Sequence, residues 1–312
     1  MNPPYAAVAL AGATASGKSE AALCLAARLN GEIISVDSMQ VYRGLDIGSA
    51  KPSGEDRRRV PHHLIDVAGL GEVFDAASFV AMANAAIQKI QAAGKRPILC
   101  GGTGFYFTAL REGLGDAPRV DLALRHELES IPLETLLDEL QRTDPATFAT
   151  IDRRNPRRVI RAVEVIRLSG RPFSAQRAVW GRQHGGAELW IWLGLKRQTP
   201  DLHERISQRV DLMFERGLVA ETKALLELGL EQNRTAMQAI GYRQVVEHLR
   251  GVRSLDETIN LVKARTRQFS KRQMTWFRKY LPLEWIEVAP GESAEAICDR
   301  LVSFCRRGQA DA

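Results

Sequence analysis

The fold is decided by the segment Gly12-Ala13-Thr14-Ala15-Ser16-Gly17-Lys18-Ser19, which matches the pattern G-x-x-x-x-G-K-[ST] at every position. A short apolar run, residues 6–11, precedes it, and an Ala- and Leu-rich stretch, residues 18–30, follows it. A strand, a glycine-rich turn and a helix in this order surround phosphate oxygens with backbone amides at the positive end of the helix. Lys18 adds a mobile positive charge, and the Ser19 hydroxyl suits a magnesium ion that bridges to the phosphates. The segment therefore predicts a polyphosphate-binding loop without saying which reaction uses it.

Strand and helix signals alternate around this loop. Residues 33–36 and 97–100 are short apolar runs, and residues 75–93 have a helical apolar stripe. The stripe consists of Phe79, Met82, Ala86 and Ile90. Strands separated by helices predict an α/β fold with a parallel sheet. We expect a core like that of the P-loop NTPases, flanked by helices.

The texture of the chain changes between residues 115 and 199, which are rich in Arg and interrupted by prolines. We expect a small helical insertion domain there, and a core made of residues 1–114 and 200–312. Near the end of this stretch, residues 191–195 alternate in a way that predicts a strand returning to the main sheet. After Pro200 the chain is expected to be mostly helical, with Ile206, Val210, Met213 and Phe214 at helical spacing.

Composition excludes several classes of protein. The chain has 312 residues and a net charge of +6, and it contains no apolar run of 18 residues, so no membrane span is expected. Its four cysteines form no CxxC pair, which argues against a zinc site or disulfides and favours a reducing cytoplasm. His62 and His63 are adjacent, so their side chains diverge, and a structural or hydrogen-bonding role is favoured over a shared metal.

The position of the acids narrows the chemistry. Loops of this kind usually work with a magnesium-binding Asp at the end of a later strand, but residues 97–100 lead into Gly101-Gly102-Thr103 without one. The acid that does follow an apolar run is Asp37, at the open edge of the expected sheet. Asp37 is either a general base or the cap of a turn. Spacing alone leaves both open.

Further blocks follow the loop in a fixed order: Asp37-Ser38-Met39-Gln40, His62-His63-Leu64-Ile65-Asp66, Gly101-Gly102-Thr103-Gly104-Phe105-Tyr106, Arg161-Ala162-Val163-Glu164-Val165, Ile240-Gly241-Tyr242-Arg243-Gln244 and Lys271-Arg272-Gln273-Met274-Thr275-Trp276-Phe277-Arg278. With the phosphate loop, this ordered set resembles the bacterial tRNA dimethylallyltransferase family over nearly the whole chain. It is far more specific than the loop alone.

The resemblance implies transfer of a dimethylallyl group from dimethylallyl diphosphate to the exocyclic amine of the adenosine 3′ of the anticodon in tRNA. The diphosphate would lie in the loop of residues 12–19 with Mg²⁺, its one protein ligand being Ser19. Lys18 would neutralise the leaving group, Asp37 would act as the base and Thr103 would donate to the leaving oxygen or the base. The resemblance also places Arg209 near the diphosphate. Gln40 has the donor and acceptor that adenine's edge requires.

Positive charge is concentrated in two clusters. One consists of Arg153, Arg154, Arg157, Arg158 and Arg161, and the other spans residues 258–283, which hold no acid. In the second, a helix would place Ile259, Val262, Phe269, Trp276, Phe277 and Tyr280 on one face. Its other face would hold Lys263, Arg265, Arg267, Lys271, Arg272, Arg278 and Lys279. A face without acids favours contact with phosphates over simple solvation.

The family's tRNA contacts, carried onto this sequence, fall on four segments and two single residues. They are Asp37, Ser38, Met39 and Gln40; Thr103; Arg125; Arg157, Arg158, Val159, Ile160 and Arg161; Gln238, Ala239, Ile240, Gly241, Tyr242 and Arg243; and Lys271 to Arg278. An anticodon stem-loop is the expected partner, and we expect a monomer.

Two other functions use the same loop. A small-molecule kinase would consume ATP without RNA, and an RNA-dependent ATPase would hydrolyse ATP when RNA binds. The missing acid after residue 100 and the basic clusters weaken the first. The absence of a second ATPase motif from the sequence weakens the other.

Overall fold

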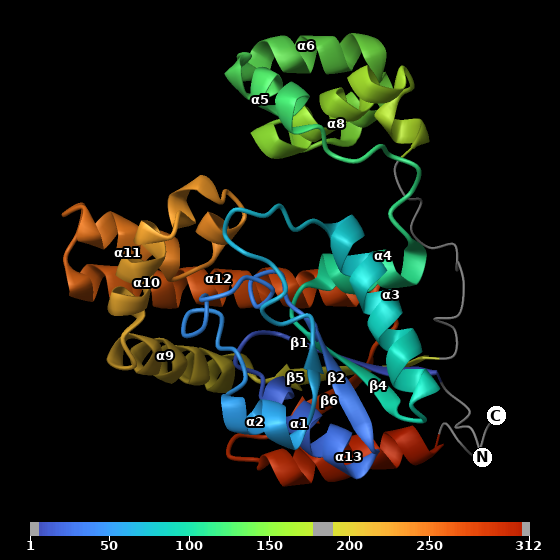
Figure 1. Ribbon diagram of the computed structural model, residues 1–312, viewed down its shortest axis with the longest axis vertical. Helices are drawn as coiled ribbons and strands as arrows, with labels where there is room; N and C mark the ends of the chain where they lie inside the picture. The colour runs from blue at the N-terminus through green and yellow to red at the C-terminus, as the bar shows by residue number, and fades with distance from the viewer. Residues whose placement is uncertain (1–5, 177–189, 308–312) are drawn as a thin grey trace. The chain divides into compact units, whose positions relative to one another are not determined.

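The computed structural model describes residues 6–176 and 190–307. A six-stranded sheet, entirely parallel, has the strand order β3-β2-β4-β1-β5-β6 (Figure 1). The strands are β1 Ala7–Gly12, β2 Gly31–Val36, β3 His62–His63, β4 Arg96–Gly101, β5 Trp190–Arg197 and β6 Glu284–Val288. The α/β class and the four expected strands are confirmed. Strand β1 is central and fully buried, as a run without polar residues requires.

Helices cover both faces of the sheet. Val8 and Leu10 of β1 face α1 (Lys18–Arg28) and α13 (Ala294–Arg307), whereas Ala9 faces the other side. That side is covered by α3 (Ala76–Ala92), α4 (Gly104–Glu112) and α12 (Leu255–Tyr280) (Figure 1). The remaining helices of this part of the chain are α2 Gly54–Arg59, α9 Thr199–Glu215, α10 Leu218–Glu227 and α11 Tyr242–Leu249.

The chain divides into two compact units, Met1–Arg111 with His184–Ala312, and Glu112–Gln183. The second unit contains α5 Leu122–Ser130, α6 Leu133–Thr143, α7 Pro145–Thr150 and α8 Pro156–Ser169. Its own core includes Leu128, Leu136 and Val163. This division differs from the expected boundaries of 115 and 199, because β5 pairs with β1 in the main sheet.

Several sequence-based expectations differ from the structure. The region after residue 200 also contains β6, an edge strand whose exposed glutamates alternate with buried Ile286 and Val288. In α3, Met82 is 37% exposed and Ala83 is buried in its place, because the buried stripe runs through Phe79, Ala83 and Ile90. None of the described helices has the length and apolar character needed to cross a bilayer.

The inner face of α12 is more polar than expected. Val262 and Phe277 are buried as expected, but the rest of the buried stripe is Thr258, Thr266, Ser270 and Gln273. The hydroxyls of Thr266 and Ser270 donate to carbonyls of their own helix, so they need no partner across the interface. Small side chains that satisfy themselves let the helix approach the sheet closely.

Gly101 offers a test of the sheet geometry. A Cβ at this position would lie 2.1 Å from the carbonyl oxygen of Val36 on the paired strand β2. We expect Gly101→Ala to lower the free energy of unfolding by about 1–3 kcal/mol, because backbone on both strands must shift. Urea denaturation measures this. The control Gly71→Ala, where nothing lies within 4 Å, should cost less than ~0.5 kcal/mol, and equal losses in the two variants would contradict the assignment.

Candidate active site

The phosphate loop joins the end of β1 at Gly12 to the start of α1 at Lys18. Ala15 (φ 63°) and Gly17 (φ 91°) have left-handed backbone conformations, which curl the chain between strand and helix. Because α1 begins at Lys18, the amides of its first turn have no acceptor within the helix. The loop therefore has the backbone form of an anion site.

Three side chains from distant parts of the sequence hold this loop. The Gln273 Oε1 atom accepts a hydrogen bond from the Thr14 amide (2.9 Å), and its Nε2 donates to the Gly102 carbonyl (2.8 Å). Arg205 Nε donates to the Ala15 carbonyl and Arg197 Nε to the Ser16 carbonyl, both at 2.9 Å. Gln273 thereby connects the loop to the carboxyl end of β4 and to helix α12.

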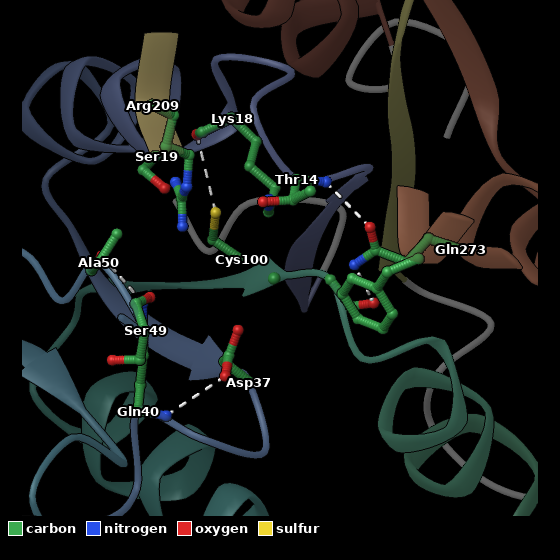
Figure 2. Close-up of a pocket in the computed structure, with 13 residues that line it drawn as sticks. Thr14, Lys18, Ser19, Asp37, Gln40, Ser49, Ala50, Cys100, Arg209 and Gln273 are labelled. Carbon is green, nitrogen blue, oxygen red and sulfur yellow. Dashed lines mark hydrogen bonds between the residues drawn. The ribbon is translucent and has the colours of Figure 1, made fainter. Parts of the chain in front are cut away.

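A pocket opens above the loop at the carboxyl ends of β1, β2 and β4 (Figure 2). Its polar lining comes from the phosphate loop, the segment after β2, helix α9 and helix α12, and its apolar side chains are Ala50 and Phe269. The lining residues are Thr14, Lys18, Ser19, Asp37, Gln40, Ser49, Ala50, Cys100, Gly101, Gly102, Arg209, Phe269 and Gln273. The fold therefore brings Lys18, Ser19, Asp37 and Arg209 to one place, as the sequence analysis expected.

Two cations in this pocket are costly to keep charged. Burial lowers the pKa of Lys18, and it also lowers the pKa of the Arg209 guanidinium. Within the described residues, neither side chain has a carboxylate at ion-pair distance, although the charge of Asp37 acts on both in the opposite sense. A bound polyanion would repay the lost solvation of both cations.

Of the two roles that spacing left open for Asp37, the structure shows the cap, and it places the same side chain at the pocket. Its Oδ1 atom accepts hydrogen bonds from the amides of Met39 (2.8 Å) and Gln40 (3.2 Å), so it caps the turn after β2. The same side chain lines the pocket (Figure 2). Thr103 supports this turn, because its Oγ1 accepts a hydrogen bond from the Ser38 amide at 3.2 Å. The two hydrogen bonds to Oδ1 hold the carboxylate in place and leave Oδ2 to face the pocket.

The side-chain amide of Gln40, which we expected to bind the edge of adenine, forms hydrogen bonds within the protein. Its Oε1 accepts from the Ser35 hydroxyl (2.8 Å), and its Nε2 donates to the carbonyls of Ser49 and Ala50 (3.2 Å each). Both ends of the amide are thus occupied inside the protein. Gln40 joins the Asp37 turn to the segment that forms the pocket wall.

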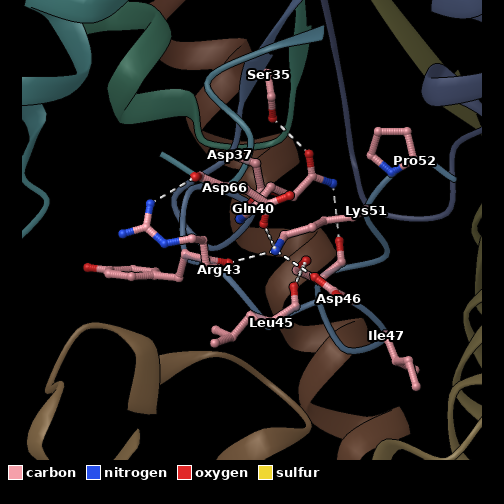
Figure 3. A network of polar contacts seen from close by, with 12 residues as sticks. Ser35, Asp37, Gln40, Arg43, Leu45, Asp46, Ile47, Lys51, Pro52 and Asp66 are labelled. Atoms are coloured by element: carbon pink, nitrogen blue, oxygen red, sulfur yellow. Dashed lines mark hydrogen bonds and ion pairs between the residues drawn. The ribbon is translucent and has the colours of Figure 1, made fainter. Parts of the chain in front are cut away.

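The far end of this wall is fixed by Lys51, whose side chain is 2% exposed (Figure 3). Its Nζ donates to the Tyr42 carbonyl (2.6 Å) and pairs with Asp46 (2.7 Å) and Asp66 (2.5 Å). Burial favours a higher pKa for Asp66, but the hydrogen bonds from Lys51 and Arg57 outweigh it and lower that pKa. No sequence pattern indicates this role of Lys51, because its partners are 5 to 15 residues away at irregular spacing.

Comparison of the sequence with known proteins shows the family. The IPP transferase family model covers residues 40–280. The chain belongs to the tRNA dimethylallyltransferase family. It is 48% identical to tRNA dimethylallyltransferase 1 of Trichlorobacter lovleyi over 89% of this chain and 92% of that protein, and 46% identical to the Geobacter metallireducens tRNA dimethylallyltransferase over 91% and 93%. The resemblance seen in the sequence is confirmed, and so is the expected class of enzyme.

Solved structures agree with this assignment. The full-length tRNA isopentenylpyrophosphate transferase of Bacillus halodurans is 38% identical, with a TM-score of 0.70 and 99% of each chain covered. A eukaryotic dimethylallyltransferase described as acting on tRNA has 26% identity and a TM-score of 0.79, over 95% of this chain and 77% of that one. The P-loop-like fold of the tRNA dimethylallyltransferases is therefore the fold of this chain.

The residues that the family resemblance assigned to tRNA differ in exposure, and several of them, such as Asp37, Gln40 and Thr103, are half-buried. Gln238, Arg243, Lys271, Arg272, Thr275, Arg278, Arg157 and Arg158 are exposed. Val159, Ile160, Ala239, Tyr242, Gln273 and Phe277 are buried, and Gly241 is a buried glycine at φ 106°. Trp276 is half-buried and donates to the Thr108 hydroxyl at 3.1 Å. The buried side chains belong to the packed interior, whereas the exposed ones are accessible from solvent.

Some of the expected basic surface is neutralised within the protein. Arg125 and Arg161 both pair with Glu164, which is fully buried, Arg161 at 2.7 Å. On α12, Lys263 pairs with Asp211 of α9 at 2.7 Å, and Arg267 donates to the Ser207 hydroxyl. The part of α12 that has no acid of its own, from Thr258 onward, thus has an acidic partner on a neighbouring helix. Among the described residues, the exposed cations of α12 without an acidic partner are Arg265, Lys271, Arg272, Arg278 and Lys279.

The adjacent histidines form separate hydrogen bonds, as expected. His63 Nε2 lies 2.7 Å from Glu32, and His62 Nδ1 lies 2.7 Å from the Val60 carbonyl. Burial lowers the pKa of His62. Across residues 6–176 and 190–307, no group of three or more His, Cys, Asp or Glu side chains is arranged to hold a metal.

A variant of this chain tests the two hydrogen bonds by which Gln273 joins the loop to β4. Gln273→Leu keeps the side-chain volume but removes both hydrogen bonds, and leaves the Thr14 amide and the Gly102 carbonyl without partners. We expect the dissociation constant for inorganic diphosphate, measured by calorimetry, to rise about tenfold. Gln268→Leu, an exposed position on the same helix, should leave it unchanged. Equal affinity in the two variants would contradict a role of Gln273 in shaping the loop.

Proposed function

We propose that the chain transfers a dimethylallyl group from dimethylallyl diphosphate to the exocyclic amine of the adenosine 3′ of the anticodon in tRNA, and releases diphosphate. The observation that carries this proposal is that Lys18 and Arg209, two cations without an acid partner among the described residues, share one pocket with the carboxylate of Asp37. Cys100 stands where a nucleotide-hydrolysing relative of this fold would place an acid, and burial raises its pKa to about 11, so its thiol is neutral.

The pocket supplies a group for each part of the reaction. The bond between the allylic carbon and the diphosphate oxygen breaks, and its electron pair leaves with the diphosphate, whose charge Lys18 and Arg209 offset. The adenine nitrogen forms the new bond to carbon, and its proton passes to Asp37. Thr103 holds the turn that carries this carboxylate. The adenine amine is a weak nucleophile, so fixed positioning of the base contributes much of the rate.

Magnesium fits the residues present. The Ser19 hydroxyl lines the pocket beside Lys18, and Mg²⁺ commonly takes few protein ligands together with substrate phosphate oxygens and water. Ser19 would hold the ion. When bound, magnesium neutralises part of the charge that develops on the leaving diphosphate.

The exposed basic residues suit the phosphates of an anticodon stem-loop. In one unit these are Lys271, Arg272 and Arg278 on α12, and in the other Arg157 and Arg158 on α8. The target adenosine must leave the stack of the loop to reach a pocket. We place this reaction in the cytoplasm, where tRNA is available, and one copy of the chain carries every group that the proposed chemistry uses.

Asp37→Asn tests the base. Asparagine can still cap the turn through its side-chain oxygen but cannot take a proton, so we expect kcat to fall about 10²- to 10⁴-fold. The assay is transfer of label from radiolabelled dimethylallyl diphosphate to undermodified tRNA with magnesium, and tRNA affinity should remain within about twofold of the wild type. A wild type that leaves the tRNA unlabelled but turns over ATP would contradict the proposed function.

Arg272→Ala with Arg278→Ala tests the basic face of α12. Loss of two phosphate contacts should lower the slope of log K against log salt for tRNA binding by about two. The matched control is Arg58→Ala with Arg59→Ala, which removes the same charge from exposed positions on α2. If both pairs change the slope equally, long-range charge explains the effect and α12 does not contact the tRNA backbone.

A further inference from the structure

The wall of the pocket opposite the phosphate loop is a short segment of turns, in which the Ala50 amide donates to the Ile47 carbonyl (3.0 Å) and the Ser49 hydroxyl to the Leu45 carbonyl. Ser49 and Ala50 line the pocket, and the segment from Asp46 to Ala50 is neither helix nor strand. Its backbone amides must therefore find partners outside regular secondary structure. How rigidly this wall is held depends on those partners.

Two side chains from helices α10 and α11 supply them. The Ile47 amide donates to both oxygens of Glu221 (3.1 and 2.9 Å), and the Gly48 amide donates to the Tyr242 hydroxyl at 3.1 Å. That hydroxyl donates its own hydrogen to Glu221 Oε1 at 2.6 Å. Each polar atom of the pair is thus used, and 174 to 194 residues of sequence separate it from the wall.

The ring of Tyr242 also fixes the wall by shape. A Cβ at Gly48 would lie 2.4 Å from Tyr242 Cε2, so the ring lies directly on the glycine backbone. Tyr242 is completely buried, and burial together with the hydrogen bond to Glu221 raises the pKa of its hydroxyl. The hydroxyl therefore stays protonated and remains a donor to Glu221.

The wall is in turn connected to the proposed base. The carbonyls of Ser49 and Ala50 accept hydrogen bonds from the side-chain amide of Gln40. The backbone N–H of Gln40 donates to Asp37 Oδ1 (Figure 3 shows this part of the network). The chain of contacts runs from Glu221 and Tyr242 through residues 47–50 and Gln40 to the carboxylate. No member of the Glu221–Tyr242 pair is among the residues that line the pocket in the described structure.

We propose that Glu221 and Tyr242 are positioning residues, which set the geometry of Asp37 by holding the pocket wall. The inference rests on the proposed function of Asp37. It assigns Tyr242 a role inside the protein, in contrast to direct contact with tRNA. It also predicts which kinetic constant changes: the chemical step should slow, whereas neither substrate should bind less tightly.

The test uses Tyr242→Phe and Glu221→Gln in the full chain, in the labelled-transfer assay. Tyr242→Phe keeps the ring on Gly48 but removes the hydroxyl, and we expect kcat to fall about tenfold. Dissociation constants for tRNA and for inorganic diphosphate should stay within about twofold. The matched control is Thr222→Val, which removes a neighbouring buried hydroxyl that donates only to its own helix at Leu218. It should lose stability without losing kcat.

A double variant separates positioning from general damage. If the pair acts through Asp37, adding Tyr242→Phe to Asp37→Asn should cause almost no further loss of kcat. A further tenfold loss, a weakened affinity for tRNA as the main effect, or an equal loss of kcat in Thr222→Val would overturn the inference. Wild-type transfer with an unaffected Tyr242→Phe would overturn this inference alone. A wild type that transfers no label would overturn the proposed function and the inference with it.

Discussion

The site depends on one buried amide, the side chain of Gln273. It joins the Thr14 amide in the phosphate loop to the Gly102 carbonyl after β4, and it belongs to the helix that carries the basic face. Through one donor and one acceptor, Gln273 therefore links the loop, the end of β4 and α12, while Arg197 and Arg205 hold the loop from other elements. Because this group is buried, its two hydrogen bonds are costly to lose.

The electrostatics of the pocket follow from that frame. Lys18 and Arg209 are brought together with a lowered pKa each, and the described lining places a neutral thiol, Cys100, at the end of β4. Asp37 is separated from them by the pocket and held by the amides of its own turn. A transfer from a diphosphate to an amine requires cations that hold the leaving anion on one side and a proton acceptor on the other.

Much of this arrangement could be predicted from the sequence. The loop of residues 12–19, Asp37 at a strand end and the α/β class depend on local patterns, and the structure confirms the fold and gathers these residues. The roles of Gln273 and Tyr242 could not be predicted, because their partners Thr14 and Gly48 lie 259 and 194 residues away. Gln40 has partners only 5 to 10 residues away, but two of them are carbonyls of a segment without helix or strand. For the same reason the sequence did not predict that Lys263 is neutralised, because its partner Asp211 belongs to another helix. On α12, every residue that periodicity placed on the inner face is buried or half-buried, but periodicity missed the small polar residues that share that face.

A crystal structure with magnesium and a non-hydrolysable analogue of dimethylallyl diphosphate tests the central claim most directly. The account predicts that the diphosphate lies in the loop of residues 12–19, between Lys18 and Arg209, with Gln273 still bridging Thr14 and Gly102. The allylic carbon should face Asp37. A diphosphate bound elsewhere on the chain, or an analogue whose allylic carbon points away from Asp37, would contradict it.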